Sequence, residues 1–242
     1  SNVNGWLTKR EVECLALFAA CPTADGEILE IGTFQGKSAI VLAKASALSN
    51  SNHIVAVDPF VLKGPVHECQ KDLSAVTLLR SNLQRAGVAS QVEFHEAYSH
   101  QLCENWDRPI RLLWIDGDHT FEGAKADFDL FSPYLANGAI IAFHDILHPF
   151  QCVRAFRQCV VESPHFGLMG MCGSIGWAQY SADPLRVVQY AAAKKKLSRQ
   201  LQPLEEFKPG PMKRVNKMHY KLRRWFVPHR AIGREHWAER VA

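Results

Sequence analysis

The chain has 242 residues, of which 47% are hydrophobic and 21% are charged, and its formal net charge is +4 at pH 7. A chain of this length can bury a sizeable core, and the composition is ordinary for a globular protein. No apolar run approaches the roughly 20 residues needed to cross a bilayer, which excludes a transmembrane helix.

The charges are distributed unevenly. Residues 194–242 hold 14 of the 28 Lys and Arg but 4 of the 24 Asp and Glu, so this segment carries +10 and the remainder −6. The seven cysteines include no C-x-x-C pair, which indicates reduced thiols rather than a disulfide framework or a zinc site. Residues 1–22 lack a basic region followed by an unbroken apolar stretch, so we expect no signal peptide and a cytoplasmic protein.

Apolar periodicity predicts helices that alternate with short strands. The predicted helices cover residues 6–20, 33–49, 68–86, 121–135 and 152–163. The predicted strands cover residues 27–32, 53–58, 91–97, 110–116 and 138–145, and residues 166–181 read as a hairpin. The segment 59–68 reads as a loop and a candidate lid. Gly87 is a good C-terminal signal for the helix before it.

This alternation is typical of a parallel sheet with helices on both faces. We therefore predict an α/β fold with a doubly wound, mostly parallel sheet, an antiparallel edge hairpin and a basic helical extension. The predicted division is an N-terminal helix at 1–24, a catalytic domain at 25–183 and the extension at 184–242. Ligands of such sheets bind beyond the carboxyl ends of the strands, where the strand order reverses.

The turn after the first strand, "EIGTFQGKSA", contains Gly32 and Gly36 in a G-x-x-x-G arrangement. Glycines here let the backbone approach a ligand, and the helix N-terminus offers free N–H groups to an anion. The spacing matches neither the dinucleotide fingerprint nor the phosphate-binding P-loop. The second strand ends at Asp58, which is placed to accept hydrogen bonds from ribose hydroxyls. Together the two signals favour a nucleoside cofactor over a tight turn without a ligand.

The stretches "EIGTFQGKSA", "VAVDPF" and "IDGDHTFEGAKADFDLFSPYLANGAIIAFHD" resemble the S-adenosylmethionine-dependent methyltransferases with a Rossmann-like fold. The resemblance spans about residues 25–180 and is nearest to the catechol-type, sugar and macrolide O-methyltransferases. It implies that Glu30 and Gly32 line the methionine end of S-adenosylmethionine and that Ser38 meets its carboxylate. Asp58 would bind the ribose, and Ser99 would contact the adenine. The implied cofactor-binding residues are Glu30, Gly32, Thr33, Phe34, Gly36, Ser38, Asp58, Ala97, Tyr98, Ser99 and Asp116.

Methyl transfer to oxygen requires an acceptor hydroxyl that loses its proton, so the site needs a base, a Lewis acid or both. In the family that the chain resembles, an Asp after the fourth strand and an acidic or amide pair after the fifth hold a metal. Asp116 and Asp145 match this pattern, whereas His144 places an imidazole where a carboxylate is usual. The predicted ligands of a divalent cation, Mg²⁺ or Mn²⁺, are Asp116, His144 and Asp145. Imidazole favours the softer ion, and a weak Mg²⁺ site without His144 or no metal at all remain alternatives.

His119 lies three residues after Asp116, where the family can carry the catalytic base, and imidazole titrates in the working range. The predicted catalytic residues are therefore His119 and Asp116. Asp118 or Thr120 could also cap the following helix, which is compatible with that role. His144 as the base and activation by the metal alone stay open.

The basic extension contains one amphipathic helix, at residues 212–227. It places Val215, Met218, Leu222 and Trp225 on one face with Lys and Arg around them. This stripe could pack on the body or on a second copy, or it could lie on an anionic membrane surface. The segment matches no nucleic-acid-binding module, which disfavours nucleic acid as a partner.

We therefore expect an S-adenosylmethionine-dependent O-methyltransferase that acts on a hydroxyl of a small molecule or sugar and forms a homo-oligomer. A peripheral contact with an anionic membrane is part of this expectation. Two alternatives are an RNA methyltransferase that grips RNA with the basic extension, and a non-catalytic module that only binds the cofactor.

Overall fold

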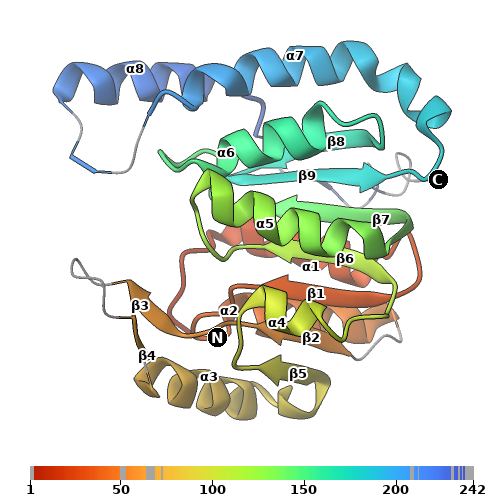
Figure 1. Cartoon of the computed structure of the whole chain (residues 1–242), viewed down its shortest axis with the longest axis vertical. Helices are drawn as coiled ribbons and strands as arrows, with labels where there is room; N and C mark the ends of the chain where they lie inside the picture. The colour runs from red at the N-terminus through yellow and green to blue at the C-terminus, as the bar shows by residue number, and fades with distance from the viewer. Residues whose placement is uncertain are drawn as a thin grey trace.

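The computed structural model shows a doubly wound α/β fold, with helices on both faces of one central sheet (Figure 1). It describes residues 3–49, 53–63, 69–71, 73–207, 210–211, 213–229, 232–233, 235 and 237. The central sheet has seven strands in the order β5-β2-β1-β6-β7-β9-β8. The first five in this order are parallel, while β9 runs antiparallel to β7 and to β8. The predicted fold class, including the antiparallel edge hairpin, is confirmed.

The strands are β1 (Glu27–Ile31), β2 (Ile54–Val57), β3 (Val61–Lys63), β4 (Cys69–Lys71), β5 (Val92–His95), β6 (Ile110–Ile115), β7 (Leu135–Phe143), β8 (Phe166–Cys172) and β9 (Ile175–Tyr180). The α-helices are α1 (Lys9–Ala20), α2 (Lys37–Ser46), α3 (Leu73–Ala86), α4 (Ser99–Cys103), α5 (Phe121–Phe131), α6 (Cys152–Ala155), α7 (Ala191–Leu201) and α8 (Arg214–Trp225). Shorter 3-10 turns are η1 (Ala47–Ser49), η2 (Ala89–Gln91), η3 (Ser132–Tyr134), η5 (Pro184–Tyr190) and η6 (Gln202–Leu204), and η4 (Phe156–Val161) is a π-helix.

The parallel strands are apolar on both sides because each side faces a layer of helices. Every residue of β2 and β6 is buried. On one face, Leu113 and Ile115 pack with the side chains of α5 and α6. On the other face, Leu112 and Trp114 pack with α1, α2 and α3. Continuous apolar strands of this kind are the mark of a parallel sheet covered on both sides.

The strand order reverses between β1 and β6. From β1 the sheet continues through β2 to β5 on one side, and from β6 it continues through β7 on the other. The carboxyl ends of these two strands therefore form the crevice where ligands of such sheets bind. Asp116 follows β6 directly, and the turn that contains Gly32 follows β1 directly.

The segments predicted as an N-terminal helix and a basic extension pack onto the same body as the sheet. The ring of Trp237 lies 5.1 Å from that of Phe18 on α1 and 5.3 Å from that of Trp177 on β9. The indole N–H of Trp237 donates to the carbonyl of Cys21. Leu197 and Leu201 of α7 are also buried. The extension is thus partly built into the core.

Several predicted bounds differ from the structure. The first helix begins at Lys9 rather than at residue 6, since Thr8 caps it and ends the segment before it. The predicted loop 59–68 and the start of the predicted helix 68–86 contain the short antiparallel pair β3–β4; residues 64–68 lie outside the described residues, as does Met212. The predicted helix 121–135 ends at Phe131, because Pro133 starts a 3-10 turn and Leu135 already belongs to β7.

Within the part of the chain that the structure describes, no helix has the length and apolar character that crossing a membrane requires.

Candidate functional site

A cavity of about 540 Å³ opens at the carboxyl ends of β1, β2 and β6. The predicted site residues that line it are Gly32, Thr33, Phe34, Ser38, Asp58, Tyr98, Ser99, Asp116, His119, His144 and Asp145. Glu30, Gly36 and Ala97 are not among the lining residues. A second cavity, of about 510 Å³, lies along α7 and η5 and contains none of the predicted residues. The first cavity is therefore the candidate site.

The turn between β1 and α2 is shaped by its two glycines. Gly32 has φ +86°, and a Cβ there would lie 2.4 Å from the backbone oxygen of Asp116. Gly36 has φ +85°, and a Cβ there would lie 2.6 Å from Leu79. Both positions need the left-handed region, and at Gly32 the bare Cα also lets the tip of the first strand lie directly against the tip of β6.

Asp58 organises this turn through its carboxylate. One oxygen accepts hydrogen bonds from the backbone N–H groups of Thr33 and Phe34, both at 2.9 Å, and the other accepts from Phe60 at 2.8 Å. Phe34 and Phe60 both have positive φ, near +47° and +49°, which costs energy for a bulky residue. The carboxylate offsets this strain by satisfying three N–H groups. Its contact with a ribose stays a prediction.

Glu30 is completely buried below the turn. Burial raises its pKa to about 8, and the hydroxyls of Ser38 and Thr33 oppose part of this effect. The side chain is therefore protonated at neutral pH. Its predicted role at the methionine end of a cofactor stays a prediction, but a neutral carboxyl can serve there only as a hydrogen-bonding group.

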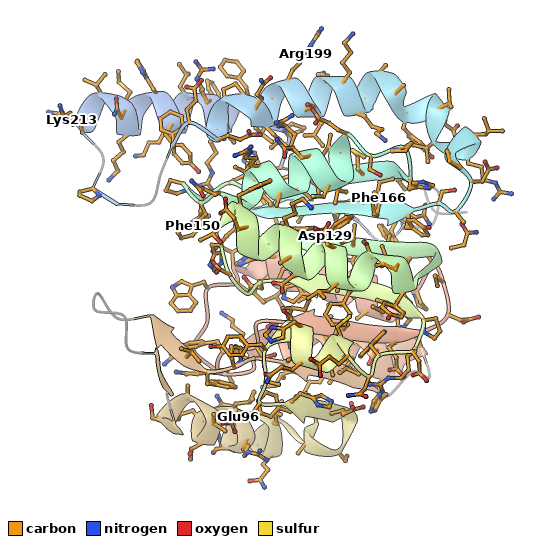
Figure 2. The ribbon with its side chains drawn as sticks, viewed as in Figure 1. Glu96, Asp129, Phe150, Phe166, Arg199 and Lys213 are labelled. Atoms are coloured by element: carbon orange, nitrogen blue, oxygen red, sulfur yellow. The ribbon has the colours of Figure 1, made fainter. Side chains whose placement is uncertain are left out.

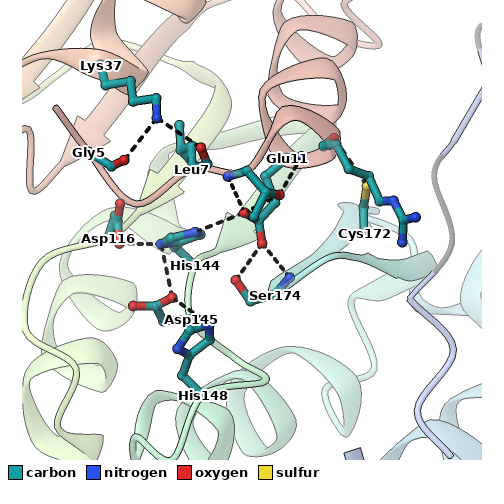
Figure 3. Close-up of polar contacts among 12 residues, drawn as sticks. Gly5, Leu7, Glu11, Lys37, Asp116, His144, Asp145, His148, Cys172 and Ser174 are labelled. Atoms are coloured by element: carbon teal, nitrogen blue, oxygen red, sulfur yellow. Dashed lines mark hydrogen bonds and ion pairs between the residues drawn. The ribbon is translucent and has the colours of Figure 1, made fainter. Parts of the chain in front are cut away.

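The tips of β6 and β7 bring together two carboxylates and two imidazoles. His144 Nδ1 lies 3.0 Å from Asp116 Oδ1 and 3.4 Å from Asp145 Oδ1 (Figure 3). His119 Nε2 lies 3.2 Å from Asp145 Oδ2 and 3.6 Å from Asp116 Oδ1. Each carboxylate thus faces both imidazoles, as the adjacent strand ends predict. Asp145 holds this position with φ +57°, a strained conformation at the point where β7 ends.

These contacts change the protonation of the site. Burial alone would lower the pKa of His119, but the nearby carboxylates of Asp116 and Asp145 outweigh it and raise the pKa to about 9. His144 behaves in the same way, and its acidic neighbours raise its pKa to about 10. Burial would raise the pKa of Asp145, yet His119 and the nearby imidazoles hold it below its ordinary value. Without a further cation, both imidazoles are protonated at neutral pH.

Glu11 on α1 is part of this cluster, although the sequence analysis did not identify it. Its carboxylate lies 3.9 Å from His144 Nε2, on the side away from Asp116 (Figure 3). The same carboxylate accepts hydrogen bonds from the N–H and hydroxyl of Ser174, both at 2.6 Å, and from the N–H of Thr8 at 2.8 Å. Burial would raise the pKa of Glu11, but these donors and His144 hold it well below its usual range. The sequence signal was present only as the capping box Thr8–Glu11.

The donor set fits a divalent cation. One ligand atom from each of Asp116, His144 and Asp145 lies within 4.8 Å of the others. With Nδ1 turned to the two aspartates, Nε2 of His144 faces the Glu11 carboxylate at 3.9 Å, an ion-pair distance that is too long for a hydrogen bond. A metal-bound imidazole commonly directs its second N–H to a carboxylate. One imidazole and two carboxylates suit Mn²⁺ or a similar ion better than Mg²⁺.

The N-terminal segment before α1 forms one wall of the cavity, which the sequence analysis also missed. The ammonium of Lys37 donates to the carbonyls of Gly5 and Leu7, both at 2.9 Å. The ring of Trp6 lies 5.1 Å from that of Phe34. Lys37 therefore fixes the segment across the start of α2, and Trp6 stands at the rim of the cavity.

Asp127 of α5 is a further acidic side chain that lines the cavity. Burial raises its pKa to about 6, with the Ser99 hydroxyl opposing the shift. The sequence did not indicate this role for Asp127, because the amphipathic pattern of α5 predicts only which apolar residues face the core.

The comparisons with known proteins agree with this geometry. Residues 29–146 match the family described as a methyltransferase domain. An uncharacterized protein of Acanthamoeba polyphaga mimivirus is 27% identical over 117 residues. The match covers 48% of this chain and 50% of that relative, so the chain spans about half the length of the relative.

Solved structures show the same fold over a larger part of the chain. An O-methyltransferase from Bacillus cereus in complex with S-adenosylhomocysteine is 20% identical, with a TM-score of 0.56, and the match covers 74% of this chain and 84% of that one. The O-methyltransferase TomG from Streptomyces achromogenes, solved with S-adenosylmethionine, is 22% identical, with a TM-score of 0.56 over 73% and 82% of the two chains. The chain therefore has the Rossmann-like fold of these structures, and its residues 29–146 are similar to a methyltransferase domain.

Proposed function

We propose that this methyltransferase domain transfers the methyl group of S-adenosylmethionine to a hydroxyl of a small molecule or sugar. The observation that carries the proposal is the cluster of Asp116, His119, His144 and Asp145 beside the glycine turn, in one cavity. The turn offers room for a nucleoside, and the cluster offers the acid–base groups that an oxygen acceptor needs. Neighbours of the same fold bind S-adenosylmethionine or its product.

The residues divide into cofactor and acceptor groups. Asp116 faces the cavity between the two strand tips, where its negative charge suits the amino group and the sulfonium of the cofactor. Ser38 and the free end of α2 suit its carboxylate. His119 and Asp145 lie on the side of the cluster toward Phe150, whose ring is 4.8 Å from that of His119. This side is where the acceptor hydroxyl is to be placed.

The protonation state decides how the hydroxyl loses its proton. His119 has a pKa of about 9 while Asp116 and Asp145 are its partners, so it is an acid rather than a base at neutral pH. A divalent cation held by Asp116, His144 and Asp145 would polarise the acceptor hydroxyl and lower its pKa. When the cation binds Asp145, the carboxylate attracts the protonated His119 less strongly, and the pKa of His119 falls. His119 can then be neutral and can accept the proton of the acceptor hydroxyl. Metal binding and base function are thus coupled through the same two carboxylates.

The acceptor is expected to be small. The cavity of about 540 Å³ must hold the cofactor together with the reacting part of the acceptor. Trp6 at the rim offers a flat apolar face, which suits the ring of a sugar or phenol. Similar structures include a calicheamicin methyltransferase, CalS11, with a TM-score of 0.53.

The proposal is tested by measuring release of S-adenosylhomocysteine across a panel of phenols, sugars and glycosides with added Mn²⁺. We expect turnover on at least one hydroxyl acceptor, and a calorimetric heat of S-adenosylmethionine binding. His119→Ala is expected to lower kcat by roughly 100-fold, within the range for a general base. His219→Ala, which changes an exposed histidine of α8 outside the cavity lining, is the matched control. Cofactor binding without turnover on any acceptor would refute the enzymatic proposal.

The role of the metal is tested separately. Treatment with EDTA followed by Mn²⁺ is expected to remove and restore activity, and Asp145→Asn is expected to weaken Mn²⁺ binding measured by calorimetry. If activity survives EDTA and Asp145→Asn is silent, the cation is not required, while methyl transfer by His119 can still hold.

A further inference from the structure

Helix α8 turns its apolar side away from the protein. The side chains of this stripe keep the following exposed fractions: Val215 58%, Met218 63%, Leu222 50% and Trp225 74%. Phe226, the next residue, is 64% exposed. Apolar residues at a spacing of three and four normally mark the face that a helix buries, so here the pattern and the packing are opposite.

The reason lies in how α8 is attached. Tyr220 is buried, its hydroxyl donates to the carbonyl of Leu147 at 2.6 Å, and its ring lies 5.0 Å from that of Phe207. The side chain of Gln200 on α7 donates to the carbonyl of Phe226 at 2.7 Å. With about 3.6 residues per turn, Tyr220 lies on the side of the helix opposite the stripe. The helix is therefore held by its tyrosine, and the stripe faces outward.

Positive charge surrounds the stripe. Residues 213–229 contain no Asp or Glu. By helical spacing, Arg214, Lys217 and Lys221 lie along one border of the stripe and Arg223 lies along the other, while Arg224 lies on the side of Tyr220. Figure 1 shows α7 and α8 along one edge of the molecule, and in Figure 2 Arg199 of α7 and Lys213 before α8 project from this edge. An apolar stripe bordered by cations on an anchored helix is the arrangement of a helix that lies in a membrane interface.

We propose that α8 docks the protein onto the surface of an anionic lipid membrane, with Val215, Met218, Leu222 and Trp225 inserted among the lipids and the flanking Lys and Arg on the headgroups. Anionic headgroups supply the complementary charge along both borders of the stripe. The protein stays peripheral, because α8 is short and is tied to the body through Tyr220.

Two other binding partners, a second copy of this chain and a nucleic acid, fit the stripe of α8 less well. In a two-fold contact between copies, the same patch meets itself, which would bring the cations of one α8 against those of the other. Nucleic acid would engage the cations, but it would leave Val215, Met218 and Leu222 in water, because base stacking needs aromatic faces.

The docking has a consequence for the cavity. Leu147, which receives the hydroxyl of Tyr220, lies two residues after Asp145 and three before Phe150 in the loop that follows β7. Membrane-bound α8 therefore lies at the end of the sheet that carries the site, and acceptors dissolved in or attached to the membrane surface are within reach of it.

The test is sedimentation of the full chain with vesicles of phosphatidylcholine alone or with roughly 30% phosphatidylserine. We expect binding to the anionic vesicles, weak binding to the neutral ones, and loss at high ionic strength. The double variant Leu222→Glu/Trp225→Glu is expected to lower the partition coefficient about ten-fold or more. Leu48→Glu, which changes a leucine that is 80% exposed on η1, is expected to bind as the wild type does.

Three results would overturn the proposal: no binding to anionic vesicles at low ionic strength, equal binding by the double variant, or binding to single-stranded RNA that vesicles do not compete with. Self-association lost in the double variant, seen by ultracentrifugation without any vesicle binding, would assign the stripe to a second copy instead. Circular dichroism shows whether the variants fold. The measurement uses neither S-adenosylmethionine nor an acceptor, so its outcome is independent of the proposed methyl transfer.

Discussion

Replacing Glu30 by Gln is expected to stabilise the protein at neutral pH, and the gain is expected to grow with pH. Glu30 is completely buried, and burial raises its pKa from 4.5 to about 8. Between these two values the unfolded chain releases the proton while the folded chain keeps it, so the unfolded state binds fewer protons and stability falls as pH rises. Gln has the same shape and carries no proton to lose.

The size of the effect follows from the two pKa values. Each pH unit between them costs the wild type about 1.4 kcal/mol, so at pH 7 the penalty is about 3 kcal/mol. The difference between Glu30→Gln and wild type should be near zero below pH 4.5, rise with this slope, and level off above pH 8. Urea unfolding followed by circular dichroism at several pH values measures it.

Using the difference between variant and wild type matters, because His119 and His144 also titrate. Their raised pKa values contribute stability that is present below pH 6.5 and is lost as pH rises through about 9 and about 10. Both proteins share this contribution, so it cancels. Glu13→Gln, on the exposed side of α1, is the matched control and should change stability by less than about 0.5 kcal/mol. A difference between the two proteins that does not change with pH would show that the pKa of Glu30 is not raised in the fold.

Three further predictions concern the site and α8. Gly32→Ala places a Cβ 2.4 Å from the backbone of Asp116 and should cost at least about 3 kcal/mol in urea unfolding. Gly87→Ala, whose Cβ would meet nothing within 4 Å, should show the smaller cost of a positive φ alone, about 1 kcal/mol; equal costs would contradict the close approach. Glu11→Gln should weaken Mn²⁺ binding about 10-fold by calorimetry, because His144 loses its carboxylate partner, and an unchanged affinity would rule out that role. Tyr220→Phe removes the donor to Leu147 and should cost about 1–3 kcal/mol in urea unfolding, whereas no loss would mean that α8 is held by other contacts.

The sheet and the strand-end residues could be predicted from the sequence because both depend on local patterns. Buried parallel strands are continuous apolar runs, and the residue after each run must lie at the same edge of the sheet. This logic predicts that Asp116, His144 and Asp145 lie together, and the structure confirms it. The bounds of α5 and α1 were harder to predict, because the apolar pattern continues past the point where each helix stops or begins. Pro133 starts the 3-10 turn that follows α5, and Thr8 caps the start of α1.

What could not be predicted depends on contacts between distant segments. Glu11 reaches His144 only because α1 packs beside the β8–β9 turn, where Ser174 binds the same carboxylate. The outward stripe of α8 was equally hidden, since its periodicity says which residues share a face but not whether that face is buried. A single tyrosine, Tyr220, decides the orientation.

Glu11 accounts for the imidazole at position 144, where the resemblance described above implies a carboxylate. A carboxylate at position 144 would stand between the side chains of Asp116 and Asp145 on one side and Glu11 on the other, four acids within one buried cluster. Like charges at this distance cannot all ionise, and one of them would have to take up a proton. An imidazole instead offers one nitrogen to each side: Nδ1 to the two aspartates and Nε2 to Glu11. Glu11 and His144 therefore form one charge-balanced unit, in which the imidazole separates the carboxylate on α1 from the two aspartates.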